Sequence, residues 1–301
     1  MKFNKPHKSV KEQAELLKTR GLKIKDMALA EHYLLHLNYY RFAGYCLPFE
    51  QNHSPQAFRA ATHFEDVLNL YTFDRELRLL LMDAIERIEV SMRTQWAYHF
   101  TKYYGSHAYL DPGLSKKTSW HVTNLKILLE ELKRTDEKFI EHYQATYSIP
   151  PTPPTWVVCE VMSLGLLSRW FTALKPSEVR ADICRTYGLP DPVLTSFIDH
   201  LSYIRNLCAH HSRTWNRRVT KTMQIPHVKY KNLRITDSFN RDPKAERKIY
   251  NTLVMIAYLL DVISPKHHWK SRLKNLIADH TINVEMMGFP GNWLQRSIWR
   301  S

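Results

Sequence analysis

Residues 64–104 read FEDVLNLYTFDRELRLLLMDAIERIEVSMRTQWAYHFTKYY and carry the longest helical periodicity in the chain. Apolar residues recur there at helical intervals, at Leu68, Tyr71, Leu77, Leu81, Ile85, Ile88 and Met92. Residues at this spacing share one face of an α-helix, and that face packs against other elements. The stretch therefore predicts one long helix over Phe64–Tyr104, with Glu86, Glu89 and Arg93 as an ion-paired flank.

Similar periodicity extends along the chain on both sides, and no segment shows a convincing strand pattern. We expect helices over Ser9–Leu17, Lys25–Leu37, Trp156–Leu174, Asp191–Ser212 and Ala245–Val262, one or two helices over Trp120–Ser148, and a short one within Pro176–Pro192. The sequence thus predicts an all-α fold, an extended helical bundle forming a single domain over residues 1–301. We expect that domain to include a basic irregular insertion at about residues 217–248 and an ordered, aromatic C-terminal segment.

The charge balance is strongly basic, with 43 lysines and arginines against 29 acidic residues and a net charge of +14. Such a surplus favours a polyanionic partner, either nucleic acid or an acidic membrane surface. A generally basic surface without a specific partner is the alternative. Only 8 glycines are present, which argues against a glycine-rich loop that cradles a nucleotide.

The cysteine pattern and the absence of targeting segments predict a cytoplasmic protein. The four cysteines are far apart and form no CxxC pair, so neither a zinc ribbon nor a disulfide framework is expected. Asp74 and Asp83 have no partner at metal-binding spacing, and we expect no metal and no cofactor. The most apolar window, Leu253–Ile263, is too short to span a bilayer and contains Asp261, so no membrane association is expected.

The segment IRNLCAHHSRTW, residues Ile204–Trp215, combines an arginine with two histidines. In a helix beginning with Asp191 as its cap, Arg205 would lie within an apolar stripe made by Leu194, Phe197, Ile198, Leu201, Ile204 and Cys208. A buried guanidinium is costly unless an anion pairs with it or a solvated cleft receives it. The sequence therefore predicts that Arg205 either pairs with an anion or borders a solvated cleft.

The two histidines differ in their predicted direction. His211 falls at the edge of the apolar stripe, whereas Arg205 and His210 would point roughly 140° apart on a straight helix. Either the helix ends or kinks near Ala209, or the site combines residues from two chains. Asn206 precedes His210 by four residues and is placed to hydrogen-bond its imidazole and fix the tautomer.

An arginine and a histidine together suit metal-independent cleavage of RNA. A histidine can take a proton from the ribose 2′-hydroxyl or protonate the leaving 5′-oxygen. An arginine can hold the phosphate and stabilise the charge that develops on it. The spacing by itself is common, however, and an arginine and a histidine tied into helix packing would give the same pattern.

Five segments of the chain resemble the abortive-infection Abi family, AbiD/AbiF-like, within the HEPN superfamily. They are LNYYRFAGYCLPF (Leu37–Phe49), LYTFDRELRLLLMDAIERIEVSMR (Leu70–Arg93), PTWVVCEVMSLGLLSRWF (Pro154–Phe171), RNLCAHHSRTWN (Arg205–Asn216) and MGFPGNW (Met287–Trp293). Their joint occurrence is far more specific than the short motif, and together they are distributed over most of the chain.

The resemblance implies a bacterial anti-phage protein with a helical HEPN core, acting as a metal-independent endoribonuclease toxin. Its pattern of an arginine, four to six residues and a histidine matches Arg205, Asn206 and His210, with His211 at the longer spacing. Because family members build the site where two HEPN units meet, the single motif implies a homodimer. RNA is the implied partner, as substrate or as a small noncoding RNA that binds and regulates the protein.

Basic residues that follow the motif are the candidate RNA contacts, namely Arg213, Arg217, Arg218, Lys229, Lys231 and Arg234. An exposed basic loop without a nucleic-acid partner is the competing interpretation of the same residues. Two other functions also stay open for the motif. It could hold RNA without cutting it, or it could stabilise a helical scaffold.

Overall fold

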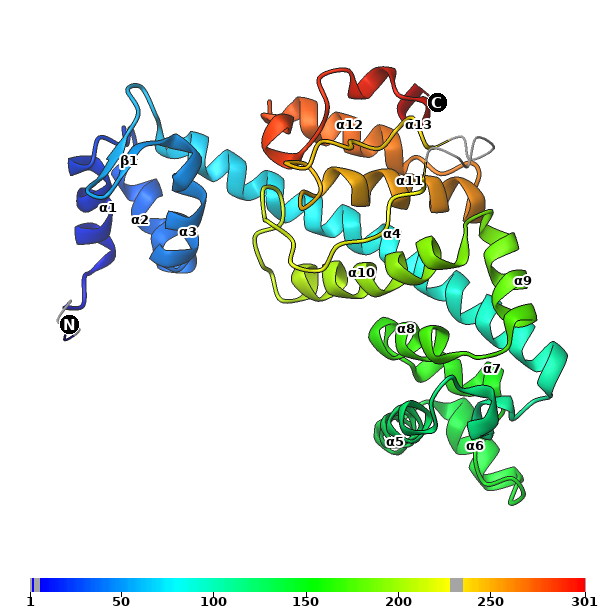
Figure 1. The fold of residues 1–301 in the computed structure, drawn as a ribbon. Helices are drawn as coiled ribbons and strands as arrows, with labels where there is room; N and C mark the ends of the chain where they lie inside the picture. Colours follow the sequence, from blue (N-terminus) through cyan, green and yellow to red (C-terminus); the bar gives the residue numbers. More distant parts are fainter. Residues whose placement is uncertain (1, 3–5, 228–234, 301) are drawn as a thin grey trace. The chain divides into compact units, whose positions relative to one another are not determined.

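The computed structural model describes the chain except for residue 1, residues 3–5, residues 228–234 and residue 301. The described residues form helices and one two-stranded sheet (Figure 1), so the predicted all-α helical bundle is confirmed. They divide into two compact units. The first comprises residues 1–78 and 273–282, and the second comprises residues 79–272 and 283–301. A single domain over the whole chain stays a prediction.

The first unit contains three short helices, a hairpin and the beginning of the long helix α4. Its elements are α1 (Val10–Thr19), α2 (Met27–His36), α3 (Tyr39–Cys46), η1 (Leu47–Phe49), β1 (Glu50–His53), β2 (Gln56–Phe58) and the first part of α4 (Phe64–Tyr104), together with the last part of α12 (Trp269–Asp279). Helix α1 begins at a capping box, in which the Ser9 side chain and Glu12 each accept from the other's backbone N–H.

The hairpin of β1 and β2 corrects the expectation that the chain has no strand. The two strands are antiparallel, with Glu50 opposite Phe58 and His53 opposite Gln56. Their sequences, EQNH and QAF, are too short and too polar to show the alternation by which a strand is recognised. Backbone pairing across the turn at Ser54 and Pro55 defines them instead.

The second unit holds most of the helices. It contains the rest of α4, η2 (Ala108–Leu110), η3 (Pro112–Leu114), α5 (Thr118–Arg134), α6 (Lys138–Thr146), α7 (Thr155–Val158), η4 (Cys159–Val161), α8 (Leu164–Ala173), α9 (Ser177–Tyr187), α10 (Asp191–Ala209), α11 (Tyr250–Ile263), the first part of α12, η5 (Val284–Met287), η6 (Trp293–Gln295) and α13 (Ser297–Arg300). Helix α8 packs against both α5 and α10 (Figure 1).

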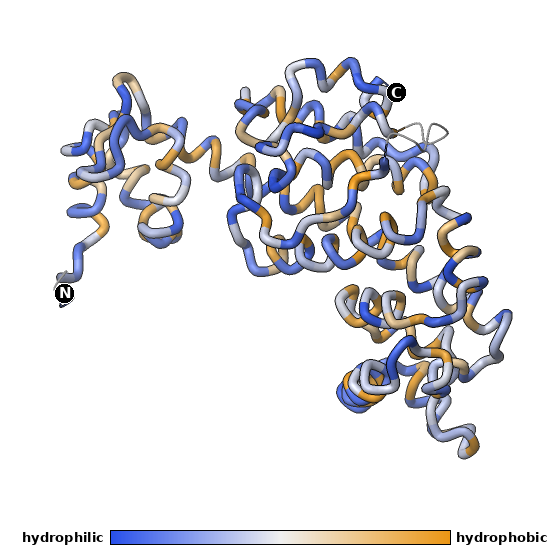
Figure 2. Tube along the Cα trace, in the orientation of Figure 1, coloured by the Kyte–Doolittle hydropathy of each residue, from blue (hydrophilic) through white to orange (hydrophobic). Residues whose placement is uncertain are grey.

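Two helices show how the long periodic stretch and the core are arranged. Helix α4 has the bounds predicted from its periodicity, and Arg93 pairs with Glu89 at 2.5 Å on the predicted flank. Helix α11 is buried at ten of its fourteen positions, which identifies it as a central helix. Most of its residues are hydrophobic (Figure 2).

The helix expected over Trp156–Leu174 is wrong, because the structure divides this segment into α7, η4 and α8. Ser163 lies between them in an extended conformation and caps α8, its Oγ accepting the Leu166 N–H at 3.3 Å. A serine that satisfies a free N–H of a first turn starts a new helix. The segment 120–148 likewise contains two helices, α5 and α6, which was one of the two alternatives.

The four cysteines are all buried and none forms a disulfide. None of the helices within the described part of the chain combines the length and the apolar character needed to cross a membrane.

Candidate functional site at the end of helix α10

Helix α10 buries one face in the core of the second unit. Leu194, Phe197, Ile198, Leu201 and Ile204 are fully buried, and Cys208 is 4% exposed. These residues are the predicted apolar stripe, and the helix packs against α8. The stripe thereby fixes the rotation of α10 and the direction of the side chains at its end.

Arg205 is half-buried, so it lies at the border of the stripe and not fully within it. Its Nη1 donates to Asn206 Oδ1 at 3.5 Å. No carboxylate among the described residues forms an ion pair with it. A guanidinium that is partly withdrawn from water and has no internal anion is a favourable place for an external anion such as a phosphate.

Helix α10 ends at Ala209, which is one of the two predicted alternatives. His210 is the C-cap, and the His211 N–H bonds to the Cys208 carbonyl at 3.0 Å. The Ser212 N–H bonds to the Leu207 carbonyl at 2.9 Å. This pair of bonds is a Schellman motif. Because α10 ends here, side-chain directions derived from a straight helix do not extend to His211. Both histidines are exposed where the chain leaves the helix.

His211 occupies the position of the Schellman motif where glycine is common. Its φ is 54°, in the left-handed region that costs a residue with a Cβ about 1 kcal/mol or more. Histidine visits this region more often than most residues but without the freedom of glycine. The end of α10 thus keeps an imidazole at a position where the backbone favours glycine.

The predicted hydrogen bond between Asn206 and the His210 imidazole is wrong for this structure. Both residues are described and exposed, and no side-chain hydrogen bond joins them. The amide oxygen of Asn206 accepts from Arg205 instead, because these adjacent side chains meet at the border of the stripe. The structure thus brings Arg205 and Asn206 together and places His210 and His211 one helical turn further along.

The start of α10 also differs from the sequence prediction. Pro190 precedes the first turn, and Asp191 is its first residue and not a side-chain cap. The Asp191 carboxylate binds Arg180 of α9 through both oxygens, with Nε at 2.9 Å from Oδ2. A charged, bidentate pair with arginine is stronger than a single cap bond to a backbone N–H, which accounts for the difference.

The described residues of the basic segment after the motif, 217–227 and 235–248, form no helix or strand, and Lys221 and Gln224 pack along α10. The Lys221 Nζ pairs with Asp199 at 2.5 Å, and the Gln224 N–H bonds to Ser196 Oγ at 2.9 Å. The chain therefore returns from the end of α10 toward its beginning, as the yellow loop in Figure 1 shows. Trp215 and Val219 are buried and anchor it.

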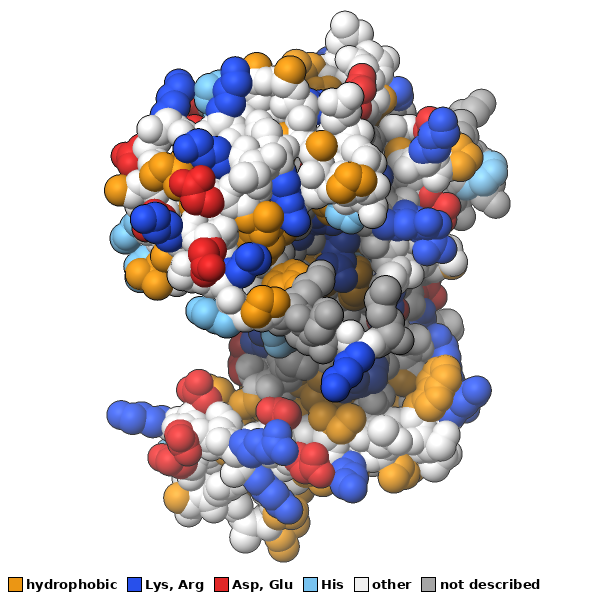
Figure 3. Space-filling view, turned by 90° about the vertical axis from the view of Figure 1, so that its left-hand side faces the viewer, with side chains coloured by type: hydrophobic (Ala, Val, Ile, Leu, Met, Phe, Trp, Pro, Cys, Tyr) orange, Lys and Arg blue, Asp and Glu red, His pale blue; other side chains and the backbone are white. Residues whose placement is uncertain are grey.

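The candidate RNA contacts are distributed unevenly over this segment. Arg213 and Arg217 are half-buried and Arg218 is exposed. Lys229, Lys231 and Arg234 lie outside the described residues. On the face drawn in Figure 3, lysine and arginine side chains are spread among acidic and apolar ones. On this face, the basic side chains therefore do not form one separate patch.

Residues 32–216 match the family described as Abi-like protein, which is more than half of the 301 residues. The chain belongs to the Abi-like family. The matched range includes Arg205, Asn206, His210 and His211, and four of the five segments that resemble the Abi family. The fifth, Met287–Trp293, lies outside it. No curated protein and no solved structure matches the chain.

The Abi-like protein contains a buried histidine on α10 that sequence reasoning missed. His200 is 2% exposed, and its Nδ1–H donates to the Lys221 carbonyl at 2.6 Å. Its Nε2 accepts from Thr252 Oγ1 of α11 at 2.8 Å, which fixes the neutral tautomer. Burial lowers the pKa of His200 to about 4. These bonds span 21 and 52 residues of sequence, so no local pattern indicates them.

Acid should destabilise the Abi-like protein through His200. The unfolded chain binds a proton near the ordinary value of 6.5, but the folded chain does so only near 4. The stabilising contribution is therefore complete above pH 6.5 and is lost as pH falls toward 4. The loss amounts to roughly 3 kcal/mol at about 1.4 kcal/mol per pKa unit. We expect His200→Gln, which cannot titrate, to remove most of this dependence.

Denaturant unfolding of the wild type and His200→Gln at several pH values between 7.5 and 4.5 measures the effect. The difference between their free energies of unfolding should shrink as pH falls. A difference that is constant over this range would contradict the assignment to His200.

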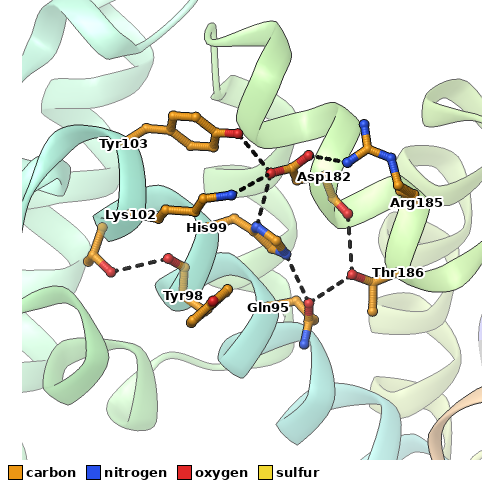
Figure 4. Close-up of polar contacts among 9 residues, drawn as sticks. Gln95, Tyr98, His99, Lys102, Tyr103, Asp182, Arg185 and Thr186 are labelled. Carbon is orange, nitrogen blue, oxygen red and sulfur yellow. Dashed lines mark hydrogen bonds and ion pairs between the residues drawn. The ribbon is translucent and has the colours of Figure 1, made fainter.

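A second polar cluster of the Abi-like protein surrounds Asp182 of α9 (Figure 4). Tyr103 Oη donates to its Oδ2 at 2.9 Å, Lys102 Nζ lies at 3.4 Å, and Arg185 Nη1 donates to Oδ1 at 2.5 Å. The Tyr103 hydrogen bond and these cations lower the pKa of Asp182 to about 2. Asp182 is thus ionised at neutral pH and holds α9 to α4 as a fixed anion.

His99 lies beside this carboxylate, with Nδ1 at 3.4 Å from Asp182 Oδ2 but without the alignment of a hydrogen bond. Its Nε2 bonds to Gln95 Oε1 at 3.2 Å, so the ring N–H is on Nε2 (Figure 4). Burial lowers the pKa of His99, against the opposing effect of Asp182. Sequence reasoning missed this cluster because its members come from two helices about 80 residues apart.

Proposed function

We propose that this Abi-like protein is a bacterial anti-phage, abortive-infection protein that acts as a metal-independent endoribonuclease. The observation that carries the proposal is the end of α10. There, a half-buried guanidinium without an internal anion precedes two exposed imidazoles by one turn. Membership in the Abi-like family supports the role in abortive infection.

The proposed reaction is a transesterification of the RNA backbone. One imidazole takes the proton of the ribose 2′-hydroxyl, the 2′-oxygen attacks the phosphorus, and the bond to the 5′-oxygen breaks. A second acid gives that oxygen a proton, which leaves a 2′,3′-cyclic phosphate and a 5′-hydroxyl. Arg205 holds the non-bridging oxygens and stabilises the charge that develops on them. His210 from each subunit of a homodimer supplies the two proton transfers, with His211 as an alternate or supporting imidazole.

The second candidate is an RNA-binding protein that holds RNA without cutting it. The observation that favours it is the bond between Asn206 and Arg205, because it leaves neither imidazole oriented by Asn206. In this case Arg205 and the basic segment along α10 bind a small noncoding RNA through its phosphates. Affinity for that RNA should fall steeply with salt in either case.

Alanine at Arg205 should reduce RNA cleavage in excess EDTA by about 10²–10³-fold, the usual loss when one group that stabilises an oxyanion is removed. Purified wild type, Arg205→Ala and the control Arg134→Ala are incubated with total and defined RNAs, and the product ends are mapped. Arg134 is 71% exposed on α5, away from the motif. The wild type and the control should leave 2′,3′-cyclic phosphate ends.

Two results would contradict the proposed ribonuclease activity. Cleavage by Arg205→Ala at the wild-type rate would show that the end of α10 is not the catalytic site. Tight RNA binding with no cleavage by the wild type would establish the second candidate, and the RNA that copurifies with the protein would then be its ligand.

A further inference from the structure

A cavity of about 560 Å³ lies between α5, α8 and the first half of α10, entirely within the second unit. Its walls are packed helices, because α8 contacts both α5 and α10. A volume of this size is typical of small-molecule sites. The cavity is separate from the end of α10, since Asp199, the α10 residue of its wall nearest in sequence to the motif, precedes Arg205 by six residues, about 9 Å of helix.

Two buried polar side chains of the cavity wall have no hydrogen-bond partner among the described residues. Asn124 of α5 is 4% exposed and Ser168 of α8 is 2% exposed. Their polar atoms are open to the cavity, so they are placed to hydrogen-bond with a ligand that fills it. The Asn124 amide therefore points to a ligand with its own donors and acceptors.

Three charged groups in the wall, Arg180, Asp191 and Asp199, are already paired with opposite charges. Arg180 binds Asp191 through both of its oxygens and also donates to the Phe171 carbonyl at 2.6 Å. Asp199 pairs with Lys221 at 2.5 Å. The buried part of the ligand should therefore be uncharged.

The more exposed part of the wall is aromatic and cationic. Trp120 is 39% exposed, and Lys117 Nζ lies 4.7 Å from the centre of its ring. Arg169 is exposed and forms no ion pair or hydrogen bond among the described residues. A flat ring stacks well on an indole, and an exposed guanidinium binds phosphate.

We propose that this cavity binds an adenine nucleotide. The base stacks on Trp120, its edge hydrogen-bonds to Asn124 and Ser168, and its phosphate reaches Arg169. Adenine is favoured because the two adjacent donor and acceptor atoms on its edge, N6 and N7, match the amide of an asparagine. A purely apolar ligand would leave Asn124 unsatisfied, and inorganic phosphate would not use the indole. The site does not depend on cleavage at the end of α10.

The cavity can receive adenine and its phosphate from two sources, a free mononucleotide or an unpaired base of an RNA strand. Calorimetric titration of the full chain with AMP, adenosine, inorganic phosphate and a short oligoadenylate separates these sources. Binding of AMP identifies a free nucleotide as a ligand. Binding of the oligoadenylate alone identifies an RNA base, and either result supports the site if the variants below weaken it.

Asn124→Leu and Arg169→Ala should each raise the Kd at least 10-fold, whereas Arg134→Ala on the same helix α5 should leave it unchanged. Asn124→Leu keeps the side-chain size and removes only the amide, and circular dichroism verifies its fold. Arg169→Ala should also abolish the preference for AMP over adenosine. No binding of AMP or oligoadenylate, or equal binding by folded variants and wild type, would overturn the proposal. Cleavage in EDTA is scored separately, so its loss or presence does not decide this test.

Discussion

Alanine at His210 should lower the rate of RNA cleavage by about 10²–10⁴-fold, the usual contribution of one acid or base group. His210 is the C-cap of α10 and is exposed, so its replacement removes an imidazole without opening the core. Single-turnover cleavage of a defined RNA in EDTA measures the effect. Circular dichroism should show unchanged helix content.

His211→Gly is the matched variant, because it removes the neighbouring imidazole and relieves the backbone. The left-handed φ of 54° should make this replacement stabilise the protein by about 0.5–1 kcal/mol in denaturant unfolding. We expect cleavage to fall less than 10-fold in it, as for a supporting group. If His210→Ala stays active while the more stable His211→Gly is inactive, the two histidines have the opposite roles.

Alanine at Asp74 should lower the free energy of unfolding by about 3–5 kcal/mol, the cost of breaking a buried ion pair from one side. The Asp74 carboxylate is fully buried, 2.5 Å from Arg78 Nη1, and accepts from Tyr45 Oη at 2.6 Å. Its removal leaves the guanidinium of Arg78, 5% exposed, without this anion. Denaturant unfolding followed by circular dichroism measures the loss.

Asp83→Ala is the control for this prediction. Asp83 pairs with Arg87 at 2.9 Å and with Arg272 at 3.1 Å, but its side chain is 31% exposed. Solvent screens such pairs, so its removal should cost within about 1 kcal/mol. Equal effects of Asp74→Ala and Asp83→Ala would show that the buried pair contributes no more than the exposed one.

The sequence by itself determined the family and also those helices whose hydrophobic pattern is local. Helix α4 has its predicted bounds, and the apolar stripe of α10 is buried as its spacing requires. Both follow from a repeat that every turn of the helix reinforces. The segments resembling the Abi family, four of them within the matched range 32–216, indicated the family correctly.

Tertiary structure decided the features that join distant residues. His200 is held by Lys221 and Thr252. Asp191 binds Arg180 instead of capping its own helix. The basic segment returns along α10, which its composition did not reveal. Each is a contact between residues that are separate in sequence, and the free energy of such a contact depends on packing that no local pattern records.

The candidate site lies between these two cases. Arg205, Asn206, His210 and His211 were found from the sequence, because their spacing and the family segments are local. The position of Arg205 at the border of the stripe and the left-handed turn at His211 were not predicted. The burial of Arg205 depends on how α10 packs in the second unit. The left-handed turn depends on where α10 stops, and a Schellman motif without its usual glycine leaves no residue type that marks that turn.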